Sequence, residues 1–374
     1  MPENTLPLVL IIDEEVHEIA TAPLPLNASG RVRAQAVHPS DLELADVATA
    51  SLVLVDQELK LDVAQQPLAM WIPDGVALAT ALRRHLARSK EKHSPTAFAL
   101  LSSELAGLAD PLPVVAGRTQ IARHNNLDWA FDKRDEKRFD QIISLAEAVA
   151  RIPRSWTRGI NGFGDVASLL GLSPDEQDAE SCWEVVERCH PPIHEVSQWT
   201  HGIAFIRWLL QSILSYPCFL WDSRRVAARW RVKHSDFVAA LEDSEALRKW
   251  LEPSAYTGAL ADFDGPRWWG HRIELLAWVA TGGDAQDSMQ LRKQVSERAG
   301  RELLATENEP PVLCTGEDFC PLDETLSYEK AVRVQPDGWP AYAETAWMPL
   351  EVVRASPRLR AMVVPDDKER LDGQ

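Results

Sequence analysis

The chain has 374 residues, of which 45% are hydrophobic and 25% are charged, and this ordinary composition excludes a disordered or fibrous protein. A single hydrophobic core rarely grows beyond roughly 250 to 300 residues, so the length predicts two domains rather than one. The formal net charge of −17 disfavours nucleic acid and anionic membrane surfaces as partners, because it repels their phosphate groups.

Residues 1–150 have the pattern of an α/β domain. Short apolar runs alternate with stretches of helical spacing, as in a parallel sheet covered by helices. Five strands are predicted at Leu6–Ile12, Arg31–Val37, Ser51–Val55, Ala97–Leu101 and Asp128–Phe131. Helices are predicted over Val76–Ser89 and over Arg138–Arg151, and the second of these closes the domain.

Residues 151–305 are predicted to form a tryptophan-rich helical domain. Twelve of the 14 tryptophans lie after residue 155. The apolar spacing is helical over Val196–Leu214, Val226–Leu241 and Arg272–Val279. Because no output chemistry is recognisable in this region, we expect it to be a protein-interaction surface.

Residues 306–374 are proline-rich and predict an extended C-terminal arm. Only short elements are expected in it, at Ala331–Val334 and Trp347–Arg354. Trp339 and Tyr342 would be costly to leave in water, so we expect the arm to pack over the rest of the protein.

Polar side chains follow the ends of four of the predicted strands. In chain order they are Asp13 and Glu14, Asp56, Ser102, and Lys133. The carboxyl ends of parallel strands meet at one edge of a sheet, so these side chains are expected to share a crevice. Converging carboxylates repel one another unless a cation bridges them, which predicts a magnesium site. The lysine and the hydroxyl can contact a phosphoryl group on Asp56.

This arrangement resembles the receiver domain of two-component response regulators. The matching text is LVLIIDEE, LVLVD, FALLSS and WAFDK, and IPDGVALATALRRH resembles the family's segment after the acceptor strand. The resemblance implies a doubly wound, five-stranded parallel sheet of flavodoxin-like order. It also implies roles for the site residues: Asp13, Glu14 and Asp56 bind magnesium, Asp56 is the phosphoacceptor, Ser102 is the switch hydroxyl, and Lys133 contacts the phosphoryl group.

We therefore expect a cytoplasmic signalling protein that accepts or senses a phosphoryl group on Asp56 and passes the signal to a partner protein, such as a histidine kinase or an effector. Enzymatic chemistry would be limited to phosphorylation and dephosphorylation of Asp56. The sequence is compatible with an oligomer. The alternative is a degenerate receiver that acts as a non-enzymatic adaptor. The segment between Asp56 and Asp74 is longer than in the family, and Arg134 replaces a proline.

Two further patterns have simpler interpretations. Six residues suggest a zinc site: Cys182, Cys189, His190, His194, Cys314 and Cys320. The first two cysteines are seven residues apart, which is wrong for a structural zinc site and favours buried core cysteines. The pair Trp268 and Trp269 could line a ligand cage, but such tryptophans are more often core.

A basic segment gives a third functional alternative, a DNA-binding response regulator. It has the pattern of two helices joined by a tight turn, and its cations are Arg224, Arg225, Arg229, Arg231 and Lys233. Helical hairpins of this kind are common in proteins that bind no DNA, where arginines cover apolar surface. The overall acidity also favours the simpler interpretation.

The cysteines and the first residues predict a cytoplasmic location. Five scattered cysteines, from Cys182 to Cys320, do not form a disulfide framework. The opening MPENTLPLVLIIDEE lacks the basic region and cleavage site of a signal peptide. No segment has the roughly 18 uninterrupted apolar residues of a membrane helix.

Overall fold

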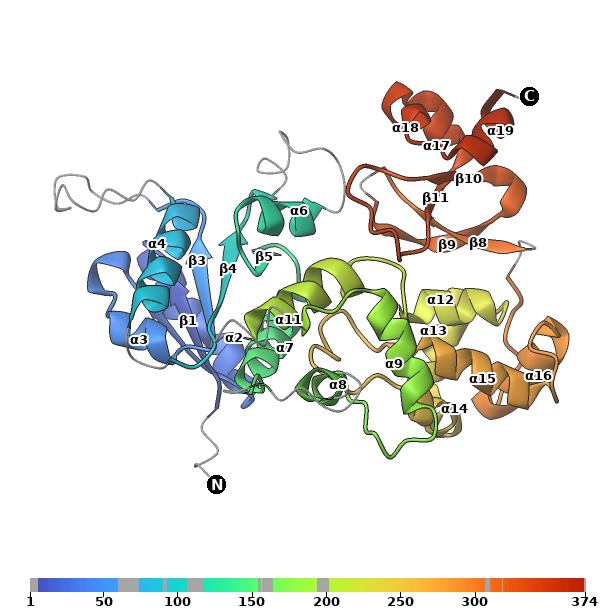
Figure 1. The fold of residues 1–374 in the computed structure, drawn as a ribbon, viewed down its shortest axis with the longest axis horizontal. Helices are drawn as coiled ribbons and strands as arrows, with labels where there is room; N and C mark the ends of the chain where they lie inside the picture. Colours follow the sequence, from blue (N-terminus) through green and yellow to red (C-terminus); the bar gives the residue numbers. More distant parts are fainter. Residues whose placement is uncertain are drawn as a thin grey trace.

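The computed structural model describes residues 6–59, 74–89, 93–105, 117–153, 156, 164–193, 202–306, 310–317 and 319–372. Most of the long segment between Asp56 and Asp74 therefore lies outside the described residues, as does the first part of the predicted helix Val196–Leu214. Figure 1 shows the N-terminal sheet at one end of the molecule, the helices of the middle of the chain beside it, and a second sheet near the C-terminus.

The N-terminal sheet has five parallel strands in the order β2-β1-β3-β4-β5, which is the flavodoxin-like order. The strands are β1 (Leu8–Ile12), β2 (Arg33–Val37), β3 (Leu52–Asp56), β4 (Ala97–Ser102) and β5 (Trp129–Asp132). Each begins and ends within two residues of its predicted bounds. The inner strands are continuous apolar runs because both of their faces are covered.

Helices cover both faces of this sheet. Leu26 of α2 and Leu145 of α7 pack on one face, whereas Val47 of α3, Leu78 of α4 and Ile121 of α6 pack on the other. The elements are α1 (Val16–Thr21), α2 (Pro23–Ala28), η1 (Pro39–Asp41), α3 (Leu44–Thr49), α4 (Gly75–Arg88), α6 (Gly117–His124) and α7 (Arg138–Ala150). The predicted helices Val76–Ser89 and Arg138–Arg151 correspond to α4 and α7.

The middle of the chain is mostly helical, with one two-stranded pair. Its elements are α8 (Asp165–Leu169), α9 (Ala179–Arg188), α11 (Ile203–Trp208), the π-helix η5 (Leu209–Leu214), β6 (Leu220–Trp221), α12 (Ser223–Arg229), α13 (His234–Asp243), α14 (Glu245–Leu251), η6 (Glu252–Ser254), β7 (Trp268–Trp269), α15 (Gly270–Ala280) and α16 (Ser288–Ala299). The predicted helix Val226–Leu241 is interrupted between α12 and α13, where Arg231 has a left-handed φ of 54°. Trp269 stacks on Phe219 in the core, with ring centroids 5.4 Å apart, so the core interpretation of this tryptophan pair is confirmed.

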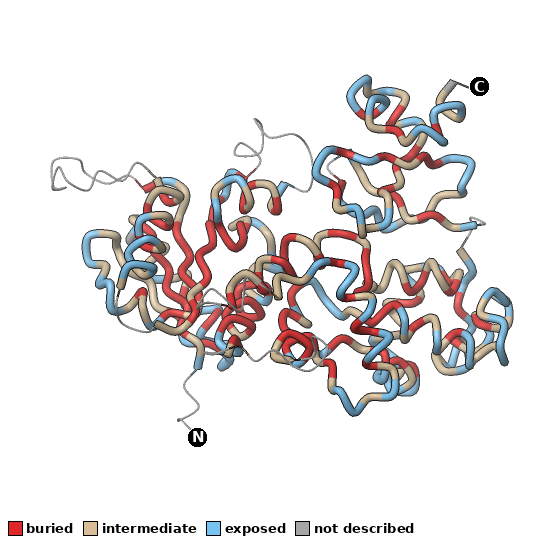
Figure 2. Tube along the Cα trace, in the orientation of Figure 1, coloured by how far each residue is buried: buried red, intermediate tan, exposed pale blue. Residues whose placement is uncertain are grey.

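We refer to the elements from α8 to α16 as the helical region. This region shares a hydrophobic core with the N-terminal sheet. Phe263 packs edge-on against Trp129 of β5, with centroids 5.4 Å apart, and also contacts Phe131. Helix α7 is buried over most of its length because it lies between the sheet and the helical region. In Figure 2 the buried part of the tube continues from the sheet into the neighbouring helices. The predicted boundary at residue 150 therefore crosses a continuous core.

The C-terminal segment differs from the predicted extended arm, because it forms a four-stranded sheet of order β10-β11-β8-β9. Its elements are β8 (Pro311–Thr315), β9 (Pro321–Ser327), η7 (Tyr328–Lys330), β10 (Ala331–Val334), β11 (Ala346–Pro349), α17 (Leu350–Ala355), α18 (Pro357–Ala361), η8 (Pro365–Asp367) and α19 (Lys368–Asp372). Pro311 and Pro321, which suggested irregular structure, are each the first residue of a strand, where the missing N–H is tolerated. Val332, Met348 and Val353 belong to a local core.

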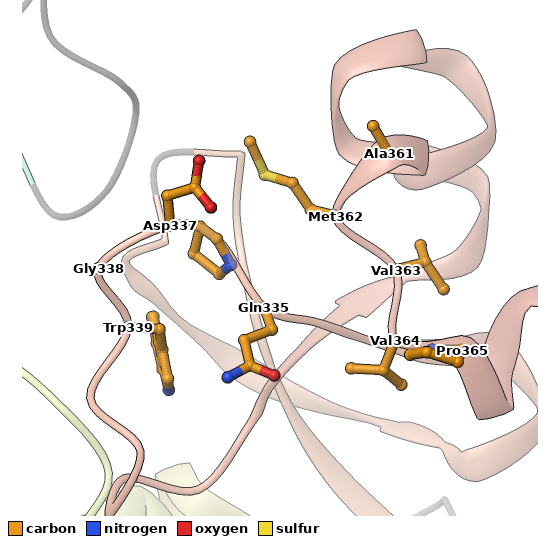
Figure 3. Close-up of a pocket in the computed structure, with 10 residues that line it drawn as sticks. Gln335, Asp337, Gly338, Trp339, Ala361, Met362, Val363, Val364 and Pro365 are labelled. Carbon is orange, nitrogen blue, oxygen red and sulfur yellow. The ribbon is translucent and has the colours of Figure 1, made fainter.

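A pocket of about 370 Å³ opens in this C-terminal segment (Figure 3). Trp339 and Gln335 lie on one side of it, and Met362 and Val364 lie on the other. The backbone N–H of Gln335 donates to the carbonyl of Met362 at 2.9 Å, so the two sides are joined.

No helix in the described ranges combines the length and apolarity needed to cross a membrane.

A buried carboxylate at the start of β5 joins three parts of the fold. Asp128 is fully buried and accepts a hydrogen bond from the backbone N–H of Phe98 in β4 at 2.7 Å. Arg83 of α4 lies 2.8 Å from one of its oxygens, and Arg207 of α11 pairs with the other. One side chain thus connects the sheet, a helix on its face and the helical region.

Replacing this carboxylate by its amide should destabilise the protein. Asp128→Asn keeps the shape but leaves two arginines without their counter-charge, and breaking a buried pair costs about 3 kcal/mol. Urea unfolding measures the loss. The control is Asp262→Asn, whose side chain is 70% exposed beside Arg31, and which should cost less than about 1 kcal/mol. Equal losses in the two variants would contradict this role for Asp128.

Candidate functional site

Lys133 joins two carboxylates at the carboxyl edge of the N-terminal sheet. Its ammonium nitrogen lies 2.7 Å from Oδ1 of Asp56 and 3.1 Å from Oδ2 of Asp13. Asp13 directly follows β1, Asp56 is the last residue of β3, and Lys133 directly follows β5. Since β1 and β3 are neighbours and β5 lies two strands from β3, the long lysine side chain spans β4 to reach them.

The two-residue period of the strands explains which of the five predicted site residues meet. Asp13, Asp56 and Lys133 continue the side-chain rows that face α7, because the residues two positions earlier are in that core: Ile11, Leu54 and Phe131. Ser102 of β4 belongs to the row on the opposite face, after Leu100. Asp13, Asp56 and Lys133 meet, and none of the described contacts joins the side chain of Glu14 or Ser102 to them.

The two carboxylates are held by backbone groups as well as by the lysine. The N–H of Glu15 donates to Oδ1 of Asp13 at 2.9 Å, and the N–H of Glu58 donates to Oδ2 of Asp56 at 3.0 Å. Each is a local turn in which an aspartate binds the backbone two residues later. Asp13 is almost fully buried, whereas the Asp56 side chain keeps 13% of its surface exposed. Asp56 is thus the more accessible carboxylate.

Burial and charge act in opposite directions on this pair. Burial raises the pKa of Asp56, and the nearby Lys133 offsets only part of that effect. The pKa of Lys133 is also raised, because hydrogen bonds and attraction from Asp56 and Asp13 outweigh its own burial. The lysine therefore stays charged and neutralises one of the two carboxylates, so the cluster keeps a net negative charge when both carboxylates are ionised.

Gly75, at the start of α4, fits directly against β3. A β-carbon there would lie 1.9 Å from the carbonyl oxygen of Asp56. The N–H of Gly75 also donates to the carbonyl of Gln57 at 3.1 Å, and Asp74 caps the helix by accepting from Ala77 N at 2.8 Å. This contact positions the backbone of Asp56. In the sequence, only the pair Asp74-Gly75 indicated this contact.

Gly75→Ala should therefore disturb both the helix start and Asp56. Backbone atoms must move to admit the methyl group, which costs about 1–3 kcal/mol in thermal or urea unfolding. The matched control is Gly117→Ala at the start of α6, where a β-carbon meets no atom within 4 Å. There alanine should be neutral or stabilising by about 0.5 kcal/mol. If both variants unfold alike, the close approach at Gly75 is not a constraint.

The remaining two predicted site residues make other contacts. Ser102 is buried, and its hydroxyl accepts a hydrogen bond from the N–H of Glu104 at 3.0 Å. Its carbonyl accepts from the N–H of Lys133 at 2.9 Å, so it holds the backbone of that residue. One carboxylate oxygen of Glu14 is buried without a hydrogen-bond partner. Neither side chain contacts Asp56 among the described interactions.

The donor set suits a hard cation, although the described residues hold no preformed metal centre. In the part of the chain that the structure describes, no group of three or more His, Cys, Asp or Glu side chains is arranged to hold a metal ion. Magnesium needs only one or two protein carboxylates and keeps several waters. Asp13 and Asp56 supply two carboxylates, and the unpartnered oxygen of Glu14 is a third candidate ligand.

The suggested zinc ligands that the structure describes do not assemble. Cys182, Cys189 and Cys314 are buried free thiols, as expected for core cysteines, and Cys320 is exposed. Burial raises the pKa of Cys182 to about 11, so its thiol stays protonated. His190 is exposed, and His194 lies outside the described residues.

The basic segment forms two short helices, but three of its arginines bind carboxylates within the chain. Arg224 lies 3.1 Å from Asp323, and Arg229 lies 2.6 Å from Glu274. Arg225 pairs with Glu344. These ion pairs compete with any phosphate backbone for the same guanidinium groups.

Comparison with known proteins assigns the chain to no family. No protein-family model matches it, and no curated protein shows a significant match. The site must therefore be interpreted from its own geometry.

Removing the shared ammonium group should destabilise the protein in a pH-dependent way. Lys133→Met leaves two buried carboxylates side by side, which costs about 3 kcal/mol at pH 7. Without the ammonium group, the pKa of Asp56, which burial already raises, rises further in the folded state, and this state then binds protons more readily than the unfolded chain. Stability of the variant should therefore recover as pH falls from 7 toward about 4.

Urea unfolding at several pH values measures this effect, with the exposed Lys293→Met as control. In the unaltered protein, the contribution of Lys133 is present below its ordinary pKa of 10.5 and is lost as pH rises through its raised folded value. If the loss of stability in Lys133→Met does not change with pH, Lys133 does not balance the charges of the two carboxylates.

Proposed function

We propose that the N-terminal α/β unit is a receiver-like phosphoacceptor domain and that Asp56 is the residue that takes the phosphoryl group. The observation that supports this most is the position of the Lys133 ammonium between Asp56 and Asp13, at the carboxyl edge of a 2-1-3-4-5 parallel sheet. In such sheets ligands bind at that edge. The protein would act in signalling rather than in metabolism.

In the proposed reaction, a carboxylate oxygen of Asp56 attacks the phosphorus of a small phosphodonor. The new oxygen–phosphorus bond forms while the bond to the leaving oxygen breaks, and the leaving group takes the electron pair. Lys133 offers N–H donors and a positive charge to the transferred oxygens. Magnesium, held by Asp13, Asp56 and Glu14, would neutralise phosphoryl charge when bound. Ser102 would hydrogen-bond the product after a short movement.

Phosphorylation would redistribute the contacts of the cluster. The added charge on Asp56 competes with Asp13 for Lys133, and Gly75 transmits any shift of the Asp56 backbone to α4. Arg83, farther along α4, binds Asp128 together with Arg207 of the helical region. The helical region would pass the change to a partner protein.

The second candidate function is a non-enzymatic adaptor with a receiver fold. The observation that favours it is that Lys133 already binds both carboxylates. In that case the cluster serves stability alone. A DNA-binding output has less support, because Arg224, Arg225 and Arg229 are engaged within the chain.

Incubation with magnesium and acetyl phosphate, followed by intact-mass measurement, tests the proposal. We expect one added phosphoryl group, no addition in Asp56→Asn, and no addition when magnesium is chelated. Asp132→Asn is the matched control and should still be phosphorylated. Asp132 also ends a strand, but it binds the backbone N–H of Arg134 at 2.8 Å and lies outside the cluster. A folded protein that gains no mass would favour the adaptor.

A further inference from the structure

Two cysteines of the helical region that are distant in sequence lie together in its core. Cys189 follows the end of α9, Cys218 lies between η5 and β6, and both are buried free thiols. The indole N–H of Trp208 donates to the carbonyl of Cys189 at 2.9 Å. The same indole ring stacks on Phe219, the neighbour of Cys218, with ring centroids 6.3 Å apart. The sulfur of Cys218 also lies 3.4 Å from the carbonyl oxygen of Ile213.

The contacts of the two sulfur atoms make Cys218 the better nucleophile. The thiol of Cys189 hydrogen-bonds the sulfur of Cys218. Burial alone would raise the pKa of Cys218, but this hydrogen bond, two from the N–H groups of Leu220 and Phe219, and the charge of Arg267 lower it. The pKa of Cys189 is raised, because its proton is held in the hydrogen bond and because the thiol is buried. The thiolate is the reactive form of cysteine, so Cys218 should react first.

Two other buried cysteines lack this arrangement. The sulfur of Cys182 lies 3.8 Å from the carboxylate of Asp178, and burial raises the pKa of Cys182 to about 11. Burial also raises the pKa of Cys314 to about 12. None of the described contacts joins either sulfur to a second thiol. These two cysteines are therefore internal controls for any reaction that depends on the pair.

We propose that Cys189 and Cys218 form a reversible disulfide when hydrogen peroxide reaches the pair. The thiolate of Cys218 attacks one peroxide oxygen, so that a sulfur–oxygen bond forms while the oxygen–oxygen bond breaks. The leaving hydroxide takes the electron pair and the proton that Cys218 released, which gives water. The sulfur of Cys189 then attacks the sulfenic acid, and the hydroxyl leaves as a second water with the proton of Cys189. Two thiols are thus oxidised while one peroxide is reduced to two waters.

The position of the pair gives this bond a consequence for the fold. Three residues before Cys218, the side-chain oxygen of Ser215 lies 2.9 Å from that of Thr119 in α6. A covalent bond to Cys189 would restrain the segment by which the helical region holds α6. This modification site goes beyond the proposed function, because oxidation would act on that contact without any reaction at Asp56.

Treatment of the folded full chain with hydrogen peroxide, followed by intact-mass measurement and peptide mapping without reduction, tests the proposal. We expect the loss of two hydrogen atoms, about 2 Da, and one cross-linked peptide that contains Cys189 and Cys218. Dithiothreitol should restore the original mass. Cys182 and Cys314 should stay unmodified at the same dose of peroxide.

Two variants separate the roles of the two thiols. In Cys189→Ser the sulfenic acid on Cys218 meets no resolving thiol, so dimedone should label Cys218. Cys218→Ser should give neither the cross-link nor a label on Cys189. The matched control Cys182→Ser should form the cross-link like the unaltered chain. Circular dichroism verifies that each variant is folded, and the peptide map of the unaltered chain decides the question if a variant does not fold.

Three results would overturn the proposal. The first is a folded, peroxide-treated chain that shows no loss of mass. The second is oxidation of Cys218 to sulfinic acid, which dithiothreitol does not reverse, in place of the cross-link. The third is a cross-link that joins other pairs among the five cysteines, or that appears only when urea unfolds the chain.

Discussion

The interaction on which the site depends is the ammonium group of Lys133 between two carboxylates at a sheet edge. Two buried acids that follow neighbouring strands would repel each other, so a cation must lie between them. Here the lysine is that cation, and strand order and the two-residue period determine that it can reach them. A phosphoryl group on Asp56 would change this balance, because it adds charge beside the only cation of the described cluster.

The rest of the molecule is arranged around the face of the sheet that carries α7. That face is covered by the helical region, and Asp128 joins the sheet to α4 and α11 through two arginines. A continuous core resists small independent movements, so a change at Asp56 can bias contacts farther away. On the helical region, Leu275, Trp278 and Val279 of α15 remain exposed.

Much of the N-terminal sheet was predictable, because its strands are short apolar runs that end in polar residues. The meeting of Asp13, Asp56 and Lys133 followed from strand order, whereas none of the described contacts brings the side chain of Glu14 or Ser102 to them. The C-terminal sheet was not predicted, since the proline-rich text after residue 305 was interpreted as an extended arm, although Pro311 and Pro321 each begin a strand. The contacts of Asp128 with Arg83 and Arg207 depend on residues that are distant in sequence, and no local pattern reveals them. The Asp-Gly pair was the only sequence signal of the Gly75 contact.

A crystal structure of the protein with magnesium and beryllium trifluoride, a stable mimic of the phosphoryl group, tests the central claim most directly. The account predicts the mimic on the Asp56 carboxylate, with the Lys133 ammonium within hydrogen-bond distance of it and magnesium beside Asp13. Asp56 and Lys133 on opposite edges of the sheet, or the mimic bound elsewhere while Asp56 stays unmodified, would contradict it.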